Sequence, residues 1–380
     1  MHLGKFHRAI HLLVQDYEQS ATAEKLKALI DQLTAVAANP GNDDVMKGYK
    51  DRLESLRTAL SGSTLNRPFP TLRKILEEIG ATKFVGDEFF DEVRTVIDNN
   101  RLLPQSAAGA LTKLRSKLEN FYLKVRQIDE AFSELAVEYV NLDDGETELG
   151  ISIPVEHKSK TLLDLSLVAK SWHKNLAPFV EVFSDDNEPI KLDIMSSSDW
   201  QFYLTTSMAV MGGISLAMSG VNDILRKLVE TRKLIKSLRD AGTSADAVAA
   251  VERDADTRLD KSLKEAATKI VAENYKKDDA GRKNELEIAM ANSLKFIAKQ
   301  ISENVTIEVR LELPLPPKEI EGEQSPEAVQ ELERQKAEYA RLQQLHNQFQ
   351  QATNSLPALD GEDVQLLALE VGDEPADETV

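Results

Sequence analysis

Two histidines near the start of the chain have the spacing of a metal-binding pair. His7 and His11 stand four residues apart, so on a helix both imidazoles face the same way and can share a metal ion. The residues between them are Arg8, Ala9 and Ile10, so the glutamate of an HExxH zinc site is missing, and no third ligand lies nearby in the sequence. Partly exposed helix histidines without a metal are the preferred interpretation, and we expect no metal and no cofactor.

A second group of chemistry-bearing residues follows a predicted strand. Glu156 and Lys158 come directly after that strand, and Asp143 and Asp144 precede Glu156 by 13 and 12 residues. This order faintly resembles the D…(D/E)xK arrangement of restriction-type nucleases, in which carboxylates hold Mg²⁺ and the lysine assists the attacking water. The chain lacks a basic groove for DNA, and Pro154 would disrupt a central strand. A solvated strand end is therefore preferred.

Other catalytic and cofactor-binding patterns are missing from the sequence. Cysteine is absent, which excludes disulfides, cysteine zinc sites and cysteine nucleophiles and fits a reducing compartment. No Walker A loop, GxGxxG or GxSxG motif occurs. The serine-rich segment Ser196–Asp199 is better explained as the start of a helix that Ser198 caps. We therefore expect no catalytic residues and favour a non-enzymatic role.

Acidic residues are concentrated at the end of the chain. The 380 residues include 46 basic and 64 acidic ones, for a net charge of −18, and positions 316–380 hold 4 basic and 15 acidic residues. So acidic a protein is not expected to bind nucleic acids generally. The last residues have a disordered composition, and Val364–Leu369 within them is either a docking motif or a segment that packs back on its domain. The first 20 residues predict an amphipathic helix rather than a signal peptide, so we expect a cytoplasmic protein.

The longest uncharged run has the length of a bilayer-spanning helix. Residues 200–222 carry no charge over 23 positions. The residues that would make interfacial or close helix contacts are Trp200, Tyr203, Ala209, Gly213 and Ala217. Nine of the 19 residues from Phe202 to Gly220 are Ser, Thr, Gly or Tyr, which is weak hydrophobicity for a spanning helix. A core helix on a sheet is preferred, and conditional membrane insertion is the alternative.

A basic segment follows the uncharged run. Its cationic residues are Arg226, Lys227, Arg232, Lys233, Lys236 and Arg239. They could contact an anionic surface or nucleic acid. A solvated helix face, or pairing with an acidic partner such as the chain's own tail, is the preferred interpretation.

The first 140 residues predict helices only. One runs from about Thr22 to Ala38 and is closed by Pro40–Gly41, the next starts at Asn42, and Pro70 fits the first position of a short helix. The last of these helices is the clearest local signal. It runs from Ser106 to about Val140, roughly 50 Å at 1.5 Å per residue. Apolar residues recur at spacings of three and four and form a heptad face: Leu111, Leu114, Leu118, Phe121, Val125, Ile128, Phe132, Leu135 and Tyr139. The alternatives are a dimerising coiled coil and a central helix packed by the preceding helices, of which the second is preferred.

The pattern changes to strands after Gly145. Residues 149–155 and 305–313 alternate apolar and polar side chains, and Phe179–Phe183 and Ile190–Ile194 are also predicted strands, with a helix over 159–175 before them. The four strands predict one antiparallel sheet, interrupted by a helical insertion at 199–303. A proline-rich segment follows, and then a polar helix to about Thr353.

Together these patterns predict a predominantly helical α+β protein. A helical bundle at 1–142 precedes an α+β domain at 143–313, and a linker, polar helix and acidic tail occupy 314–380. The leading hypothesis is a non-enzymatic interaction or adaptor protein that docks or self-associates through the heptad face and recruits a basic partner with its tail. The alternatives are a membrane-acting effector that uses residues 200–239 and a Mg²⁺-dependent nuclease.

Overall fold

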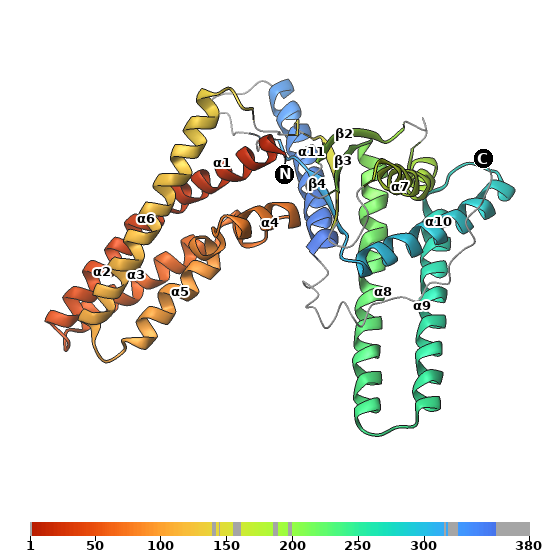
Figure 1. Ribbon diagram of the computed structural model, residues 1–380. Coiled ribbons are helices and arrows are strands. Elements are labelled where there is room, and N and C mark those ends of the chain that lie inside the picture. The colour runs from red at the N-terminus through yellow and green to blue at the C-terminus, as the bar shows by residue number, and fades with distance from the viewer. Residues whose placement is uncertain are drawn as a thin grey trace. The chain divides into compact units, whose positions relative to one another are not determined.

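The computed structural model describes residues 2–138, 142–143, 145–154, 161–184, 189–196, 200–314, 317 and 326–354, without the side chains of 326–329, 331 and 354. The chain divides into two compact units, Met1–Asn141 and Leu142–Val380. Helices account for 77% of the structure, and four antiparallel strands form one sheet (Figure 1). The predicted fold class, a predominantly helical α+β protein, is confirmed.

Unit 1 is helical throughout its described residues. Its helices are α1 (Leu3–Ser20), α2 (Thr22–Ala38), α3 (Asp43–Ser61), α4 (Pro70–Glu78), α5 (Gly86–Asn99) and α6 (Pro104–Glu134). The side chain of Asn42 caps α3 by accepting hydrogen bonds from the backbone N–H groups of Asp44 and Val45. Pro70 occupies the first turn of α4, where its missing N–H costs nothing. These short-range signals place the helices where the sequence predicts them.

Helix α6 ends earlier than its heptad pattern predicts. The last helical residue is Glu134, and Ala136 adopts a left-handed conformation with φ of 52°. The N–H of Val137 donates to the Phe132 carbonyl at 2.9 Å, and the N–H of Ala136 donates to the Ser133 carbonyl at 3.1 Å. This pair of bonds is a Schellman cap, formed here without the usual glycine, so no local residue marks the end of the helix. The predicted extension to Val140 is wrong.

Unit 2 is built on the sheet. Its strands are β1 (Thr147–Ile153), β2 (Lys191–Ser196), β3 (Trp200–Thr205) and β4 (Thr306–Leu311), in the order β2-β3-β1-β4. Ile151 lies opposite Phe202 on β3 and Ile307 on β4, and these apolar residues belong to the main core of the unit. The other face carries polar residues, including Glu148 and Arg310, which form an ion pair. The sheet therefore has one apolar face for helices to cover.

The helices of unit 2 are α7 (Leu162–Phe183), α8 (Met208–Asp240), α9 (Ala245–Asn274), α10 (Ala280–Ser302) and α11 (Pro326–Asn354). Two sequence predictions fail here. Phe179–Phe183 is the last part of α7 rather than a strand, because the helix continues through Pro178 and buries Phe179 and Val182. Residues 200–205 form β3 rather than the start of a helix, so the helical insertion between strands begins at Met208.

The polar helix predicted near the end of the chain, α11, lies against β4. The side-chain oxygen of Thr353 accepts a hydrogen bond from the N–H of Val309 at 3.2 Å, and a ring nitrogen of His346 lies 2.9 Å from the Leu311 carbonyl. From α8, the amide of Asn222 donates to the Ala352 carbonyl at 2.7 Å. Helix α11 thereby covers the β4 edge of the sheet, whereas β2 is the opposite edge.

Candidate functional site

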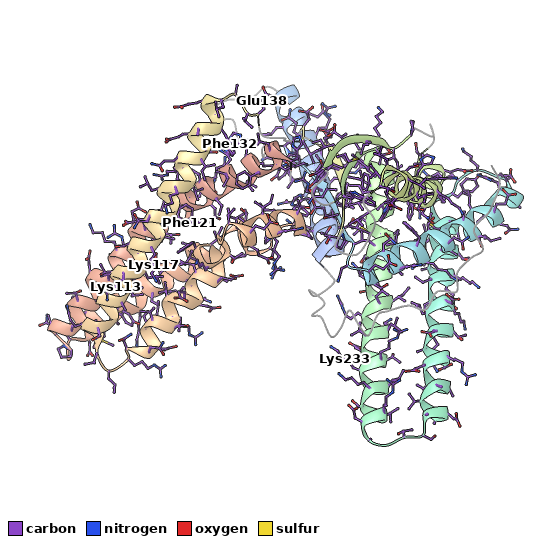
Figure 2. The ribbon with its side chains drawn as sticks, viewed as in Figure 1. Lys113, Lys117, Phe121, Phe132, Glu138 and Lys233 are labelled. Carbon is purple, nitrogen blue, oxygen red and sulfur yellow. The ribbon has the colours of Figure 1, made fainter. Side chains whose placement is uncertain are left out.

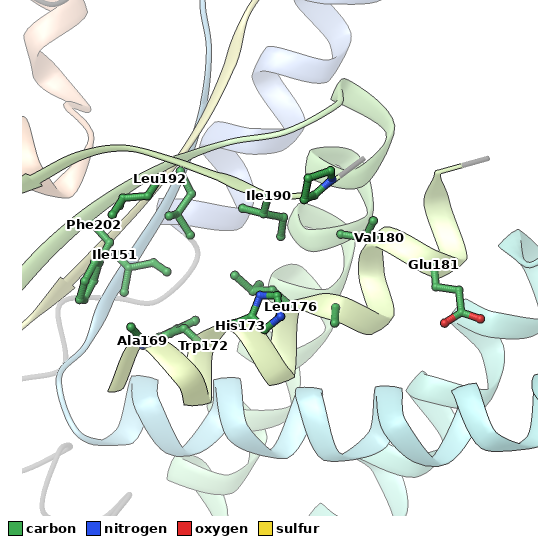
Figure 3. A pocket seen from close by; sticks show the side chains of 13 residues that line it. Ile151, Ala169, Trp172, His173, Leu176, Val180, Glu181, Ile190, Leu192 and Phe202 are labelled. Atoms are coloured by element: carbon green, nitrogen blue, oxygen red, sulfur yellow. The ribbon is translucent and has the colours of Figure 1, made fainter. Parts of the chain in front are cut away.

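An apolar groove opens between α7 and the sheet of unit 2. Its volume is about 440 Å³, and it opens to solvent. The lining residues are Ala169, Trp172, His173, Leu176, Ala177, Val180 and Glu181 from α7, and Ile151, Pro189, Ile190, Leu192, Phe202 and Leu204 from the sheet and the segment before β2. Figure 3 shows Ile190 and Leu192 on one side of this space and the α7 residues on the other.

Helix α7 forms the first wall of the groove because one side of the helix is buried and the other side carries small, exposed residues. Thr161 and Asp164 begin the helix with a capping box, in which each side chain bonds the other residue's backbone N–H. Trp172 is buried and meets the ring of Phe296 on α10 edge to face, with the ring centres 4.9 Å apart. The exposed positions Ala169 and Ala177 are small, so α7 leaves space next to the sheet.

The second wall comes from the sheet edge. Among the described residues, strand β2 pairs only with β3, through a register that shifts between Leu192 and Ile194. The side chain of Leu192 is 56% exposed although it faces the groove. Behind it, Phe202 and Ile151 supply a buried apolar floor. An exposed leucine over an apolar floor is typical of a site that receives another apolar group.

A bidentate ion pair lies at one end of the groove. Arg282 on α10 donates from Nε and Nη2 to the two carboxylate oxygens of Glu181, at 2.7 and 2.6 Å. These hydrogen bonds hold the pKa of Glu181 below its usual range. In Figure 3 the Glu181 carboxylate points away from Ile190 and Leu192. The groove therefore keeps an apolar interior, with the charge turned outward.

The described lining of the groove is mostly apolar. Among these residues, only His173 and Glu181 have titratable side chains, and Glu181 is bound by Arg282. The described lining includes no serine, threonine or lysine. On α7, the exposed lysines 170 and 174 each follow a lining residue.

The histidine pair of α1 is joined by a residue that the sequence analysis did not include. Asp129 of α6 lies between the two imidazoles, 3.3 Å from His7 Nε2 and 3.3 Å from His11 Nδ1. The other ring nitrogen of His7 donates to the Val137 carbonyl at 2.5 Å. His7 is buried, so the prediction of partly exposed histidines is wrong for it. Across the described residues, no group of three histidine, cysteine, aspartate or glutamate residues is arranged to hold a metal ion. This cluster links α1 to the end of α6.

The first part of the heptad face packs inside unit 1. Leu111, Leu114, Leu118 and Val125 are buried in its core. The two phenylalanines that Figure 2 labels on α6 also contact unit 1: Phe121 stacks on Phe84 at 4.6 Å, and Phe132 meets Phe6 at 5.9 Å. Ile128 and Leu135 are exposed, and Tyr139 lies outside the described residues. A buried residue outside the predicted face, Tyr122, stacks on Tyr17 at 3.9 Å. The interpretation of this helix as a central helix packed by its neighbours therefore applies to the buried residues of the heptad face.

The five residues predicted for membrane or close helix contact lie on two different elements. Trp200 and Tyr203 are buried on β3, so they form no interfacial belt on a helix. On α8, Gly213 and Ala217 are buried and Ala209 is exposed. Helix α8 is long and apolar enough to cross a membrane, and 56% of its apolar window is buried within the structure. The uncharged run therefore consists of the core strand β3 followed by the first part of α8, most of which is buried.

The basic segment lies on the second half of α8, beside α9. Arg232 Nη2 is 3.0 Å from Asp256 of α9, and Arg239 Nη2 is 2.7 Å from Glu252 of the same helix. Arg226 is 3.9 Å from Asp223. The remaining cations are exposed on α8: Lys227, Lys233 (labelled in Figure 2) and Lys236. Pairing with acidic residues, which the sequence analysis preferred, holds for these arginines, with α9 as a partner.

Several predicted features fall outside the described residues. They are Asp144, Glu156 and Lys158 of the nuclease hypothesis, Ser197–Asp199, and the tail motif Val364–Leu369. Asp143 is described, and its N–H donates to the side chain of Glu146 at 2.9 Å. The cap of α8 is Ser207, whose hydroxyl accepts from the Val210 N–H, so the cap assigned to Ser198 is wrong.

Comparisons with known protein families, with curated proteins and with solved structures gave no match. Sequence reasoning missed the groove because it ended the helix at position 175 and assigned Phe179–Phe183 to a strand. The usable signal was the row Leu162, Ala169, His173, Val180, whose helical spacing places apolar and small residues on one face.

Proposed function

We propose that this protein is a non-enzymatic interaction protein whose groove on unit 2 receives an apolar segment of a partner protein. The observation that carries the proposal is the space of about 440 Å³ between α7 and β2, with exposed Leu192 on its wall. Lysines 170 and 174 on α7, each one residue after a lining residue, favour a segment with acidic residues next to its leucine-type side chains. The heptad face and the acidic tail remain additional proposed contacts.

Simple energetics set the expected strength of such docking. Full burial of one leucine-type side chain contributes about 1.5–3 kcal/mol, and a groove of this volume holds roughly two of them. Association and ordering costs remove several kcal/mol from the total. The apolar term of about 3–6 kcal/mol, less these costs, predicts a dissociation constant of about millimolar or weaker for the groove alone, so tighter docking requires contacts beyond it.

A peptide selection tests the proposal. A displayed random peptide library is selected on the whole protein, and bound peptides are re-tested against Leu192→Asp and Ala177→Trp. The first change puts a charge on the wall, and the second fills the space. The matched control is Leu234→Asp, which changes an exposed leucine of α8 that does not line the groove. Enriched leucine-containing peptides that lose binding only with the groove variants support the proposal. Peptides that bind all variants equally, or no enrichment, overturn it.

The membrane hypothesis remains as an alternative because α8 is long and apolar enough to span a bilayer. It requires the buried start of α8 to leave the core of unit 2, including the contact between Gly213 and the ring of Phe183. Flotation with anionic liposomes at low and physiological salt tests it. Flotation at both salt concentrations would favour insertion, and flotation only at low salt would indicate surface attachment through the basic segment.

A further inference from the structure

Half of the large exposed apolar side chains described in unit 2 lie on α7 and β2, the elements that form the groove walls, and Leu192 is one of the lining residues. Three large exposed residues belong to α7 and two to β2: Leu162, Leu163, Leu167, Leu192 and Met195. Leu162 falls on the same helix face as Ala169 and His173, because seven residues make nearly two turns and eleven make about three. Soluble proteins seldom leave such a surface uncovered. An occupant is therefore expected.

The end of the chain has a composition that suits binding to this surface, because it combines a short apolar run with acidic residues. Residues 355–380 hold eight acidic and no basic residues, and Val364–Leu369 within them contains three leucines and a valine. Acidic residues stand on both sides of this apolar run, at positions 362, 363, 370 and 373. On α7, the exposed lysines 170 and 174, each one residue after a lining residue, give the complementary charge.

The segment between α11 and Val364 is also long enough to reach the groove. Helix α11 ends at Asn354, and the neighbouring Thr353 is bonded to Val309 of β4. Strands β4 and β2 are opposite edges of the four-stranded sheet, so three strand spacings of about 4.8 Å, or about 15 Å, separate them. Residues 355–363 can span up to about 30 Å when extended. Val364 can therefore be placed at the β2 side without moving α11.

The basic segment of α8 is a weaker candidate for the same tail. Two of its arginines are already paired with acids of α9, Arg232 with Asp256 and Arg239 with Glu252. The cavities described in unit 2 lie between α7 and the sheet and along α9, and the cations of the basic segment line neither of them. Leucines in the tail would gain little there, whereas the groove can bury them.

We propose that Val364–Leu369 docks in the groove between α7 and β2 of its own chain and thereby competes with external partners. The inference rests on the proposed function, because it gives the groove an internal ligand that a partner must displace. The bound tail lowers the apparent affinity for any partner in proportion to its occupancy. Unit 2 would thus regulate its own interaction surface.

Cysteine trapping tests the docking directly, since the natural chain contains no cysteine. In the full chain, Ala177→Cys on α7 is combined with Leu367→Cys, and the matched control combines Leu367→Cys with Lys261→Cys, an exposed position on α9. Under mild oxidation we expect an intrachain disulfide in the first pair, formed at least about tenfold faster than in the control. A disulfide between two chains would show that a second copy supplies the tail, and equal rates in both pairs would show no preference for the groove. Either result overturns the proposal.

Competition separates this proposal from the general function. A peptide from the selection on the groove is titrated against the full chain and against Leu366→Asp/Leu367→Asp. If the tail occupies the groove for about 90% of the time, the double variant binds the peptide about tenfold more tightly. Equal affinities would refute tail docking and leave the proposed function intact. Loss of binding through Leu192→Asp, measured in the same titration, confirms that the peptide reports on the groove.

Discussion

The guanidinium of Arg282 on α10 bonds both carboxylate oxygens of Glu181 on α7, at 2.7 and 2.6 Å. The two residues are 101 positions apart in the sequence, so the pair joins the helix that forms one groove wall to the helix behind it. Arg282 also bonds Glu285 on its own helix at 2.6 Å. The pair fixes the end of α7 where the groove closes.

The Arg282 pairing predicts an acid-sensitive contribution to stability from Glu181. Hydrogen bonds from Arg282 lower the pKa of Glu181 in the folded protein. The stabilisation is therefore complete above the usual glutamate pKa of 4.5 and is lost as the pH falls through the lowered value. Glu181→Gln should reduce the free energy of unfolding at pH 7, and the difference from wild type should shrink at pH 3. Urea denaturation at both pH values measures it, with the surface variant Glu265→Gln as control; an unchanged difference would contradict the assignment.

Gly213 of α8 allows the close approach of α7. A Cβ at this position would lie 2.4 Å from two ring atoms of Phe183, closer than any real contact. We expect Gly213→Ala to destabilise the protein by about 1–3 kcal/mol, because the ring must move within a packed core. Gly212→Ala is the control, since its Cβ meets nothing within 4 Å and should raise helix stability by about 0.5–1 kcal/mol. Thermal unfolding of both variants checks the opposite signs.

Ala136 carries a left-handed backbone at the end of α6, with φ of 52°. This conformation costs an L-residue about 1–2 kcal/mol, and glycine avoids the cost but loses more entropy on folding. Ala136→Gly should therefore stabilise unit 1 by up to about 1 kcal/mol. The same substitution at Ala131, inside α6, should destabilise it by about 1 kcal/mol. Chemical denaturation distinguishes the two, and destabilisation by both would argue against the Schellman cap.

The heptad face predicts different effects along its length. Val125 is buried in the core of unit 1, so Val125→Asp should cost about 2–4 kcal/mol by burying an unpaired charge. Leu135 is 74% exposed, so Leu135→Asp should leave stability within about 0.5 kcal/mol. The molar mass from light scattering and the free energy of unfolding from denaturation together test these two effects. A fall in mass with Leu135→Asp would reveal self-association through the exposed end of α6.

Local sequence signals determined much of the fold. Helix α2 begins and ends at the predicted residues Thr22 and Ala38, because its apolar spacing and the Pro40–Gly41 break act within a few residues. The alternation in β1 and β4 likewise predicted strands, since one face of each contributes to a buried core. The hydrogen-bonding side chain of Asn42 and the fixed φ of Pro70 act on their own helix starts. Such effects need no distant partner.

Tertiary packing decided what these signals left open. Phe179–Phe183 is rich in phenylalanine and valine, as strands are, but α7 continues through it because Phe179 and Val182 are buried together at helical spacing. Trp200–Thr205 looks like part of an apolar helix, yet pairing with both β1 and β2 makes it a strand. The groove exists only once that strand, β2 and the small residues of α7 are brought together. The sequence by itself determined an acidic, mainly helical α+β chain. Contacts between residues far apart in sequence decided where its apolar surface remains open, because burial depends on neighbours that no local pattern specifies.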